Sequence, residues 1–380
     1  MGEVAAFNQK MLNTEKKIAI YGTTPCGRTA KKAIENSGGS VDIFIDRLRG
    51  GVKCFEGIPI LHFKEIEDIG QYLIINCASS NFWKITDFLF EQGVKKVYHA
   101  LSLLESIPKE DSELAMHDVR KMYEHFVKAD GNERIYKLAV ILTEKCTLRC
   151  KYCSLYMPYI ARNARNLDIT RCDLDVDKLL DAVGMLESLT VMGGEVFVHP
   201  NWGDFVTHCC MDDRIKQVVV LTNATIIPKD PKPLQSKKVV LAIDDYGDLS
   251  KKQNELIAWA REYGIKYEIV HQEHWHDVSA YEMLEETDKE RIEKFDNCQI
   301  KGCWNISGGF LYRCPVSYYK MKYMLSKEIT ESADFIDLIS LDAAEIKEQI
   351  KRLYRKKYLE ACSYCIGTDS RNLISVGEQI

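Results

Sequence analysis

The sequence predicts an α/β protein with two wound parallel sheets, followed by a small cysteine-rich region. Short apolar runs typical of strands alternate with helical stretches over residues 17–99. The same alternation restarts at residue 135, and beyond about residue 290 it breaks into short segments that carry Cys and Gly. Strands that alternate with helices favour parallel sheets, because each helix carries the chain back to the start of the next strand.

The first sheet is expected within residues 15–105, as a doubly wound unit. Its predicted strands are 17–21, 41–45, 72–75 and a short run near Val97, with helices over 28–36 and 83–91. Residues 106–134 are charged and helix-prone and contain Pro108, so we expect them to form a helical connector.

The second sheet is expected within residues 135–290. Its predicted strands are 138–142, 189–192, 217–221, 239–243 and 267–270, with helices over 174–186 and 249–263. About five strand–helix steps favour a wound barrel or partial barrel. Residues 291–380 are expected to form a separate cysteine-rich domain that includes a charged helix over 337–360.

Composition limits the classes of partner. The chain has 380 residues, of which 46% are hydrophobic and 28% charged, and a formal net charge of −5, which is typical of a globular protein without the basic surface of a duplex-DNA binder. No apolar run approaches the ~20 residues of a membrane span, and residues 1–17 lack the apolar core of a secretion signal. We therefore expect a cytoplasmic protein with neither a nucleic-acid nor a membrane partner.

Three of the 14 cysteines follow the first strand of the second sheet, as Cys146-x3-Cys150-x2-Cys153. Clustered cysteines in a reducing compartment indicate metal rather than disulfides. Three thiolates from one loop suit an iron–sulfur cluster, and three protein ligands on a four-iron cluster leave one iron open. A zinc site completed by a ligand elsewhere, or a fortuitous cysteine loop, is the alternative.

The next strand ends in Met192-Gly193-Gly194-Glu195. Two glycines let backbone groups approach a ligand closely, and the following carboxylate can accept a hydrogen bond from an ammonium group. A tight turn with a surface acid is the alternative for this segment alone.

Together these residues resemble the radical S-adenosylmethionine (radical SAM) superfamily. The resemblance covers residues 136–275 and includes Tyr152, the aromatic residue before the last cysteine. It implies a partial (β/α)6 barrel with a 4Fe-4S cluster on the three cysteines, whose open iron is chelated by S-adenosylmethionine (SAM). It further implies that Gly193, Gly194 and Glu195 hold the methionine ammonium, with Tyr152 beside the cofactor. Thr222-Asn223-Ala224 stands where relatives carry Thr-Asn-Gly, near the SAM ribose or carboxylate.

A second cysteine group lies downstream. It comprises Cys298, Cys303 and Cys314, then the pair Cys362-x2-Cys365, and a zinc ribbon is one interpretation of such distant cysteine pairs. The spacing also resembles the shortened SPASM, or twitch, extension of radical SAM enzymes. That resemblance implies one auxiliary 4Fe-4S cluster, ligated by Cys314, Cys362, Cys365 and either Cys298 or Cys303, which accepts or donates electrons.

The first unit resembles Rossmann-like domains fused to bacterial sugar- and polysaccharide-modifying enzymes. Its first strand leads into Gly22–Thr29, a turn suited to phosphate, and Asp46 follows the second strand where a ribose-binding acid would stand. Thr24, however, replaces the middle glycine of the dinucleotide-binding motif. The unit is either a scaffold or partner-docking module or a nucleotide-binding domain.

The leading hypothesis is a radical SAM oxidoreductase or isomerase/epimerase, which oxidises, epimerises or rearranges its substrate. It would cleave SAM to a 5′-deoxyadenosyl radical, with electrons from a donor such as flavodoxin or ferredoxin, and abstract hydrogen from a small polar metabolite such as a sugar or nucleotide-linked sugar. A peptide maturase is the rival enzyme, and a zinc-binding interaction protein is the rival from another class. The sequence names no catalytic residue. Candidate substrate contacts at strand ends are Asp244, Tyr246, His271, His274, Trp275 and His276, each also compatible with an ordinary cap or loop.

Overall fold

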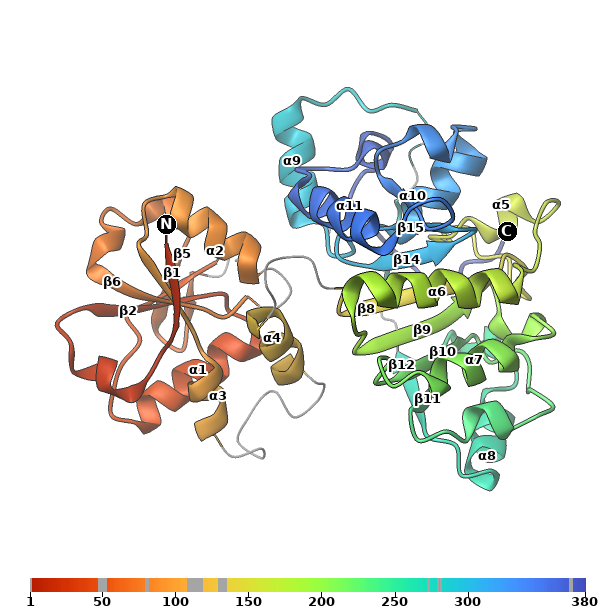
Figure 1. Ribbon diagram of the computed structural model, residues 1–380, viewed down its shortest axis with the longest axis horizontal. Coiled ribbons are helices and arrows are strands. Elements are labelled where there is room, and N and C mark those ends of the chain that lie inside the picture. The colour runs from red at the N-terminus through yellow and green to blue at the C-terminus, as the bar shows by residue number, and fades with distance from the viewer. Residues whose placement is uncertain are drawn as a thin grey trace. The chain divides into compact units, whose positions relative to one another are not determined.

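The computed structural model forms two compact units, Met1–Arg134 and Ile135–Ile380 (Figure 1). It describes residues 2–46, 53–78, 82–107, 119–128, 135–271, 274–278, 280, 282–368 and 372–380. Helix α4 (Val119–Lys128), from the stretch expected to be a connector, contacts α1, α2 and α3 of the first unit. Pro108, with the rest of 108–118 and 129–134, lies outside the described residues.

The first unit is a doubly wound sheet of order β1-β7-β6-β2-β3-β5-β4 among the residues described. Its neighbours pair in parallel except β4 with β5. The strands are β1 (Glu3–Ala6), β2 (Lys17–Tyr21), β3 (Ile43–Ile45), β4 (Cys54–Phe55), β5 (Ile58–Leu61), β6 (Tyr72–Asn76) and β7 (Lys96–His99); the helices besides α4 are α1 (Pro25–Asn36), α2 (Phe82–Glu91) and α3 (Leu101–Ser106). The predicted strands and helices are present, and β1, β4 and β5 are additional.

The second unit contains a sheet of order β12-β11-β10-β9-β8-β14-β15-β16 within the described ranges. Strands β8 (Lys137–Thr143), β9 (Ser188–Gly193), β10 (Val218–Thr222), β11 (Val239–Asp245) and β12 (Tyr267–His271) are parallel and follow chain order. The α/β fold class is therefore confirmed. Beside them, β13 (Trp275–His276) and β17 (Leu373–Ile374) form a small antiparallel pair.

The cysteine-rich region shares this sheet. Strand β14 (Trp304–Ser307) pairs in parallel with β8, on the side away from β9, with Trp304 opposite Leu138 and Ile306 opposite Val140. Strands β15 (Phe310–Tyr312) and β16 (Phe335–Asp337) extend the sheet in antiparallel fashion. The sixth parallel strand is therefore supplied by a segment more than 30 residues beyond β12 in the sequence.

A continuous apolar core joins the sheet to its helices. Leu138, Val191, Val220 and Leu241 of four neighbouring strands are fully buried in one cluster with residues of the covering helices. In Figure 1, α6 lies across β8 and β9. The helices of this unit are α5 (Met157–Ile160), α6 (Ile169–Val183), α7 (Trp202–Met211), α8 (Gln253–Glu262), α9 (Asp288–Asn297), α10 (Pro315–Tyr319) and α11 (Ala343–Arg355). None of the helices that the structure describes is long and apolar enough to cross a bilayer.

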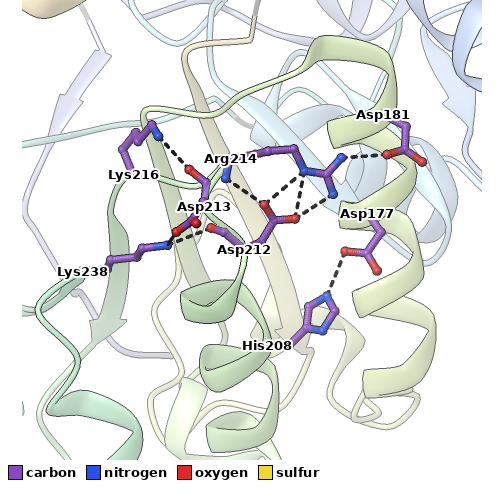
Figure 2. A network of polar contacts seen from close by, with 8 residues as sticks. All are labelled: Asp177, Asp181, His208, Asp212, Asp213, Arg214, Lys216 and Lys238. Atoms are coloured by element: carbon purple, nitrogen blue, oxygen red, sulfur yellow. Dashed lines mark hydrogen bonds and ion pairs between the residues drawn. The ribbon is translucent and has the colours of Figure 1, made fainter.

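Polar contacts fix the amino-terminal edge of the sheet (Figure 2). Arg214, just before β10, pairs with Asp212 at 2.7 Å and with Asp181 of α6 at 2.7 Å, and the Lys238 ammonium, just before β11, donates to the Asp212 carbonyl at 2.8 Å. Hydrogen bonds from Arg214 lower the pKa of Asp212. These contacts hold the strand starts in place, at the edge opposite the one that carries the cysteine loop.

Candidate functional site

The three predicted cluster cysteines line one cavity at the carboxyl ends of the parallel strands. The cavity has a volume of 390 Å³, and its wall includes Cys146, Cys150 and Cys153 from the loop after β8. The ends of β9, β10 and β11 contribute Met192, Gly193, Gly194, Leu221, Thr222, Asn223, Asp244 and Tyr246. Parallel strands place their carboxyl ends at one edge, which explains why residues distant in sequence meet here.

Hydrogen-bond donors surround the three sulfur atoms. The Leu148 N–H lies 3.4 Å from the Cys146 sulfur, and the Gln379 side-chain amide lies 3.2 Å from the Cys150 sulfur. Burial raises the pKa of Cys153, and backbone N–H groups that follow it in the chain and face its sulfur oppose part of that rise. Burial also raises the pKa of Cys146 to about 12. Metal ligation requires the thiolate, and donors to sulfur are the surroundings that tune iron–sulfur clusters.

The three thiols are soft donors of the kind that metal centres use. Among the described residues, no group of three or more His, Cys, Asp or Glu is arranged to hold one metal ion. Three soft thiols that share one cavity, with donors at each sulfur, match the ligand chemistry of iron–sulfur clusters. The residues present therefore fit the cluster that the sequence predicts.

The two glycines of the Gly-Gly-Glu segment permit a close strand contact. A Cβ atom on Gly193 would lie 2.4 Å from the Thr143 carbonyl oxygen, and one on Gly194 would lie 2.3 Å from that of Lys145 and 2.8 Å from the Cys146 Cβ. Any side chain at either position would therefore displace the cysteine loop.

Glu195 faces the protein rather than the cavity. Its carboxylate is buried and accepts hydrogen bonds from the Thr222 hydroxyl at 2.9 Å and from the backbone N–H groups of Asn223 and Phe197 at 2.8 and 3.1 Å. Burial raises the pKa of Glu195 to about 7. The residue ties the end of β9 to the end of β10, so the predicted contact with a methionine ammonium rests on Gly193 and Gly194.

The Thr222-Asn223-Ala224 turn lies beside the cysteine loop. The Asn223 side-chain amide lies 3.2 Å from the Thr147 hydroxyl and 3.7 Å from the Cys146 sulfur. Ala224 has φ = 56°, in the left-handed region that favours glycine. Alanine therefore occupies the glycine position of the predicted motif while keeping a glycine-like conformation. Tyr152 lines the same cavity, and the Lys151 ammonium lies 4.9 Å from its ring centre.

The far wall of the cavity is polar and aromatic. The Asp244 carboxylate is 8% exposed and accepts a hydrogen bond from the Tyr246 hydroxyl at 2.9 Å, and burial raises the pKa of Asp244 to about 6. The Tyr246 and Trp275 rings meet edge to face at 5.6 Å. His274 and His276 also line the cavity, whereas His271 is exposed and pairs with Asp245. Gln299 and Thr368 complete this wall, and no motif in the sequence marked them.

The cysteines of the second group differ in their electrostatic surroundings. Burial raises the pKa of Cys314, and the thiols of Cys298, Cys362 and Cys365 raise it further. Burial also raises the pKa of Cys303, with a further contribution from the Cys298 thiol.

A buried lysine stands beside this second group. The Lys320 side chain is fully buried, and its ammonium donates to the carbonyl oxygens of Val278, at 2.7 Å, and of Tyr364. Its positive charge acts on Cys365, where it lowers the pKa that burial raises. A buried cation beside grouped thiols suits a site that carries negative charge.

In the first unit, polar groups at the strand ends where a nucleotide would bind are hydrogen-bonded within the protein. Asp46 accepts hydrogen bonds from the Thr23 N–H, at 2.9 Å, and from its hydroxyl. The fully buried Tyr123 of α4 donates to the carbonyl at the end of β6 and accepts from the Ala100 N–H at 2.9 Å. Ligands of doubly wound sheets bind where the strand order reverses, here between β2 and β6. Tyr123 lies at this point, which favours the scaffold alternative.

Part of this chain is similar in sequence to a known protein family and to two named proteins. Residues 140–285 match the Radical SAM superfamily. The chain is 31% identical over 105 residues to the antilisterial bacteriocin subtilosin biosynthesis protein AlbA of Bacillus subtilis (strain 168), covering 27% of this chain and 22% of that protein. It is 25% identical over 134 residues to GTP 3′,8-cyclase of Alkaliphilus oremlandii (strain OhILAs), covering 32% and 42%. The aligned regions thus span between a fifth and two fifths of these relatives.

Solved structures show more distant likeness. BtrN in complex with AdoMet and 2-DOIA aligns with a TM-score of 0.36 and 13% identity, over 65% of this chain and 97% of that one. Streptococcus suis SuiB bound to the precursor peptide SuiA aligns with a TM-score of 0.31 and 19% identity, over 49% and 45%.

The left-handed backbone at Ala224 predicts an unusual response to glycine. Replacing a buried alanine by glycine ordinarily costs roughly 1–2 kcal/mol, from the lost methyl group and added chain freedom. In Ala224→Gly, relief of the left-handed strain, about 1 kcal/mol, should offset most of that loss. Ala260→Gly, at a buried position in α8, should show the full cost. Urea denaturation of the three proteins measures the difference, and equal losses in both variants would contradict the strain argument.

Proposed function

We propose that this chain is an enzyme that cleaves SAM reductively to a 5′-deoxyadenosyl radical, since residues 140–285 match the Radical SAM superfamily. The radical would abstract hydrogen from a small polar metabolite, a sugar or nucleotide-linked sugar, in an oxidation, epimerisation or rearrangement. The observation that carries the proposal is the convergence of Cys146, Cys150 and Cys153 on the cavity that Gly193, Gly194 and Asn223 also line. The reaction takes place in the cytoplasm, with flavodoxin or ferredoxin as electron donor.

The cysteine loop is proposed to hold the cofactor that starts the reaction. A 4Fe-4S cluster on the three thiolates would supply the electron that breaks the sulfonium C–S bond of SAM. The Gly193–Gly194 backbone would hold the methionine end of SAM, and the Asn223 amide would bind its ribose or carboxylate. Tyr152, which lines the same cavity, would pack beside the cofactor. The aromatic far wall restricts water around the radical.

The far wall supports a hydroxylated substrate. Asp244 is buried and aligned by the Tyr246 hydroxyl, so its carboxylate can accept a hydrogen bond from a substrate hydroxyl. The edge-to-face pair of Tyr246 and Trp275 offers an apolar surface next to it. A carboxylate beside aromatic rings suits a molecule with both C–H faces and hydroxyl groups, which a sugar ring has.

The second cysteine group is proposed to hold an auxiliary 4Fe-4S cluster. Its ligands are Cys298, Cys314, Cys362 and Cys365, since these four sulfurs act on one another electrostatically. Cys303 is left out of the ligand set. Four protein ligands leave no open iron, so the cluster passes electrons to or from the substrate radical rather than binding substrate.

Peptide maturation is the second candidate function. It is favoured by the 31% identity, over 105 residues, to a protein named for bacteriocin biosynthesis. In this alternative the same radical chemistry acts on a side chain of a precursor peptide, and the far wall contacts that side chain.

The assignment of the SAM-binding cluster to Cys146, Cys150 and Cys153 predicts that their removal abolishes SAM cleavage but spares the auxiliary cluster. A variant in which Cys146, Cys150 and Cys153 are all Ala should lose SAM cleavage entirely, because no thiolate remains to hold the cluster. Anaerobic reconstitution should give about eight irons per wild-type chain and about four in the variant. 5′-Deoxyadenosine is measured by chromatography. Cleavage that persists in the variant, or zinc without sulfide in the wild type, would overturn the proposed function.

The auxiliary ligand set predicts different effects of two nearby cysteines. Cys298→Ala should leave the auxiliary cluster with three protein ligands and an exposed iron, and so lower the iron content retained after gel filtration, by up to about four per chain. Cys303→Ala should keep the wild-type content. Iron and acid-labile sulfide assays measure both. The reverse pattern would move the fourth ligand to Cys303.

The substrate class predicts which compounds stimulate turnover. Free and nucleotide-linked sugars should increase 5′-deoxyadenosine formation over the rate with SAM alone, and deuterium from a labelled sugar should appear in that product. Asp244→Asn should weaken this stimulation more than it weakens uncoupled SAM cleavage. Stimulation by a precursor peptide, with none by sugars, would instead establish the maturase function.

A further inference from the structure

The segment Asn372–Ile380, called the strap below, lies against the cysteine loop although more than 200 residues separate the two in sequence. The Lys151 N–H donates to the Glu378 carbonyl at 2.7 Å, and the Ile380 N–H donates to the Arg149 carbonyl at 2.9 Å. These two bonds flank Cys150 and Gln379, which face each other as an antiparallel bridge. The strap thus pairs with the loop like a short additional strand.

The Gln379 side chain reaches into the middle of this pairing. Its oxygen accepts from the Arg149 N–H at 2.7 Å, and its amide nitrogen donates to the Cys150 sulfur at 3.2 Å and to the Gly377 carbonyl at 2.6 Å. One amide therefore holds the loop backbone and points a donor at a sulfur. An ion pair between Lys151 and Glu378, at 3.1 Å, adds a further tie on the exposed side.

The other half of the strap is anchored on the cavity wall. Leu373 and Ile374 of β17 pair with His276 and Trp275 of β13, both of which line the cavity. The Asn372 side chain donates to the Asp277 carbonyl at 2.6 Å. The strap therefore connects the proposed substrate wall to the proposed cluster loop.

We propose that Gln379 is a positioning residue for the SAM-binding cluster, which it serves by clamping the cysteine loop and by donating a hydrogen bond to the Cys150 sulfur. The inference rests on the proposed function for the identity of the bound group. A donor at a ligating sulfur stabilises the more negative, reduced state of a cluster and so raises its reduction potential. The strap makes that potential depend on a residue remote from the cysteine motif.

Three variants test the two roles of Gln379. Gln379→Leu removes both the acceptor and the donor at similar size. Gln379→Glu keeps an acceptor for the Arg149 N–H but faces the sulfur with a carboxylate oxygen. Gln235→Leu is the matched control, because Gln235 is exposed and its amide bonds only to the Tyr263 carbonyl among the contacts described.

The first measurement needs no cofactor. Cys150 is 7% exposed, so iodoacetamide should modify it slowly in the metal-free wild type and in Gln235→Leu. Loss of the Gln379 hydrogen bonds also raises the pKa of Cys150, so the rates are measured across pH by peptide mass spectrometry and compared per thiolate, where Gln379→Leu should react about tenfold faster. Gln379→Glu should stay nearer the wild type. Equal rates in Gln379→Leu and wild type would overturn the clamp.

The second measurement uses the reconstituted protein. In redox titrations followed by electron paramagnetic resonance, the midpoint potential of the SAM-binding cluster should be more negative in Gln379→Leu than in wild type. It should be more negative still in Gln379→Glu, where a negative charge faces the sulfur. An unchanged potential in both would overturn the electronic role. If the wild type takes up no iron, the proposed function fails, while the alkylation rates still decide whether the strap clamps the loop.

Discussion

The close approach of β9 to the loop after β8 is the contact on which the site depends. It exists because Gly193 and Gly194 have no side chains where the carbonyl oxygens of Thr143 and Lys145 pass within 2.4 Å of the Cβ positions. The loop can then cross the end of β9 with its sulfurs toward the cavity. Glu195 follows at once and anchors the neighbouring strand through Thr222 and Asn223. The segment from Gly193 to Glu195 therefore determines the position of both the cysteine loop and the end of β10.

Local pattern predicted the parts of the fold that depend on local chemistry. Strand β2 has the predicted bounds because its apolar run is buried in the middle of a parallel sheet. Helix α6 starts five residues earlier than predicted, at Ile169, because the Asp168 side chain caps the Thr170 N–H. It ends at Val183 because Gly184 takes φ = 81°. Caps of this kind determine the first and last residues of a helix more closely than its apolar periodicity does.

The cysteine loop was predicted from spacing, whereas residues that reach the site from distant segments were not. Gln379, Gln299 and Thr368 reach the site only through the tertiary fold. An isolated polar residue belongs to no motif and to no hydrophobic period, so nothing in the sequence marked these three. Spacing also could not separate Cys298 from Cys303. In the structure Cys298 is the residue that ends α9, whereas Cys303 leads directly into β14.

The pairing of β14 with β8 has a consequence for how the protein can be divided. The cysteine-rich region is not an appendage to a finished sheet, since it covers the backbone donors and acceptors along one side of β8. A fragment that stopped before β14 would leave that row of groups open to solvent. An uncovered, apolar strand of this kind recruits other chains and aggregates. The half that carries the cysteine loop is therefore expected to stay dispersed in solution only while the cysteine-rich region remains attached to it.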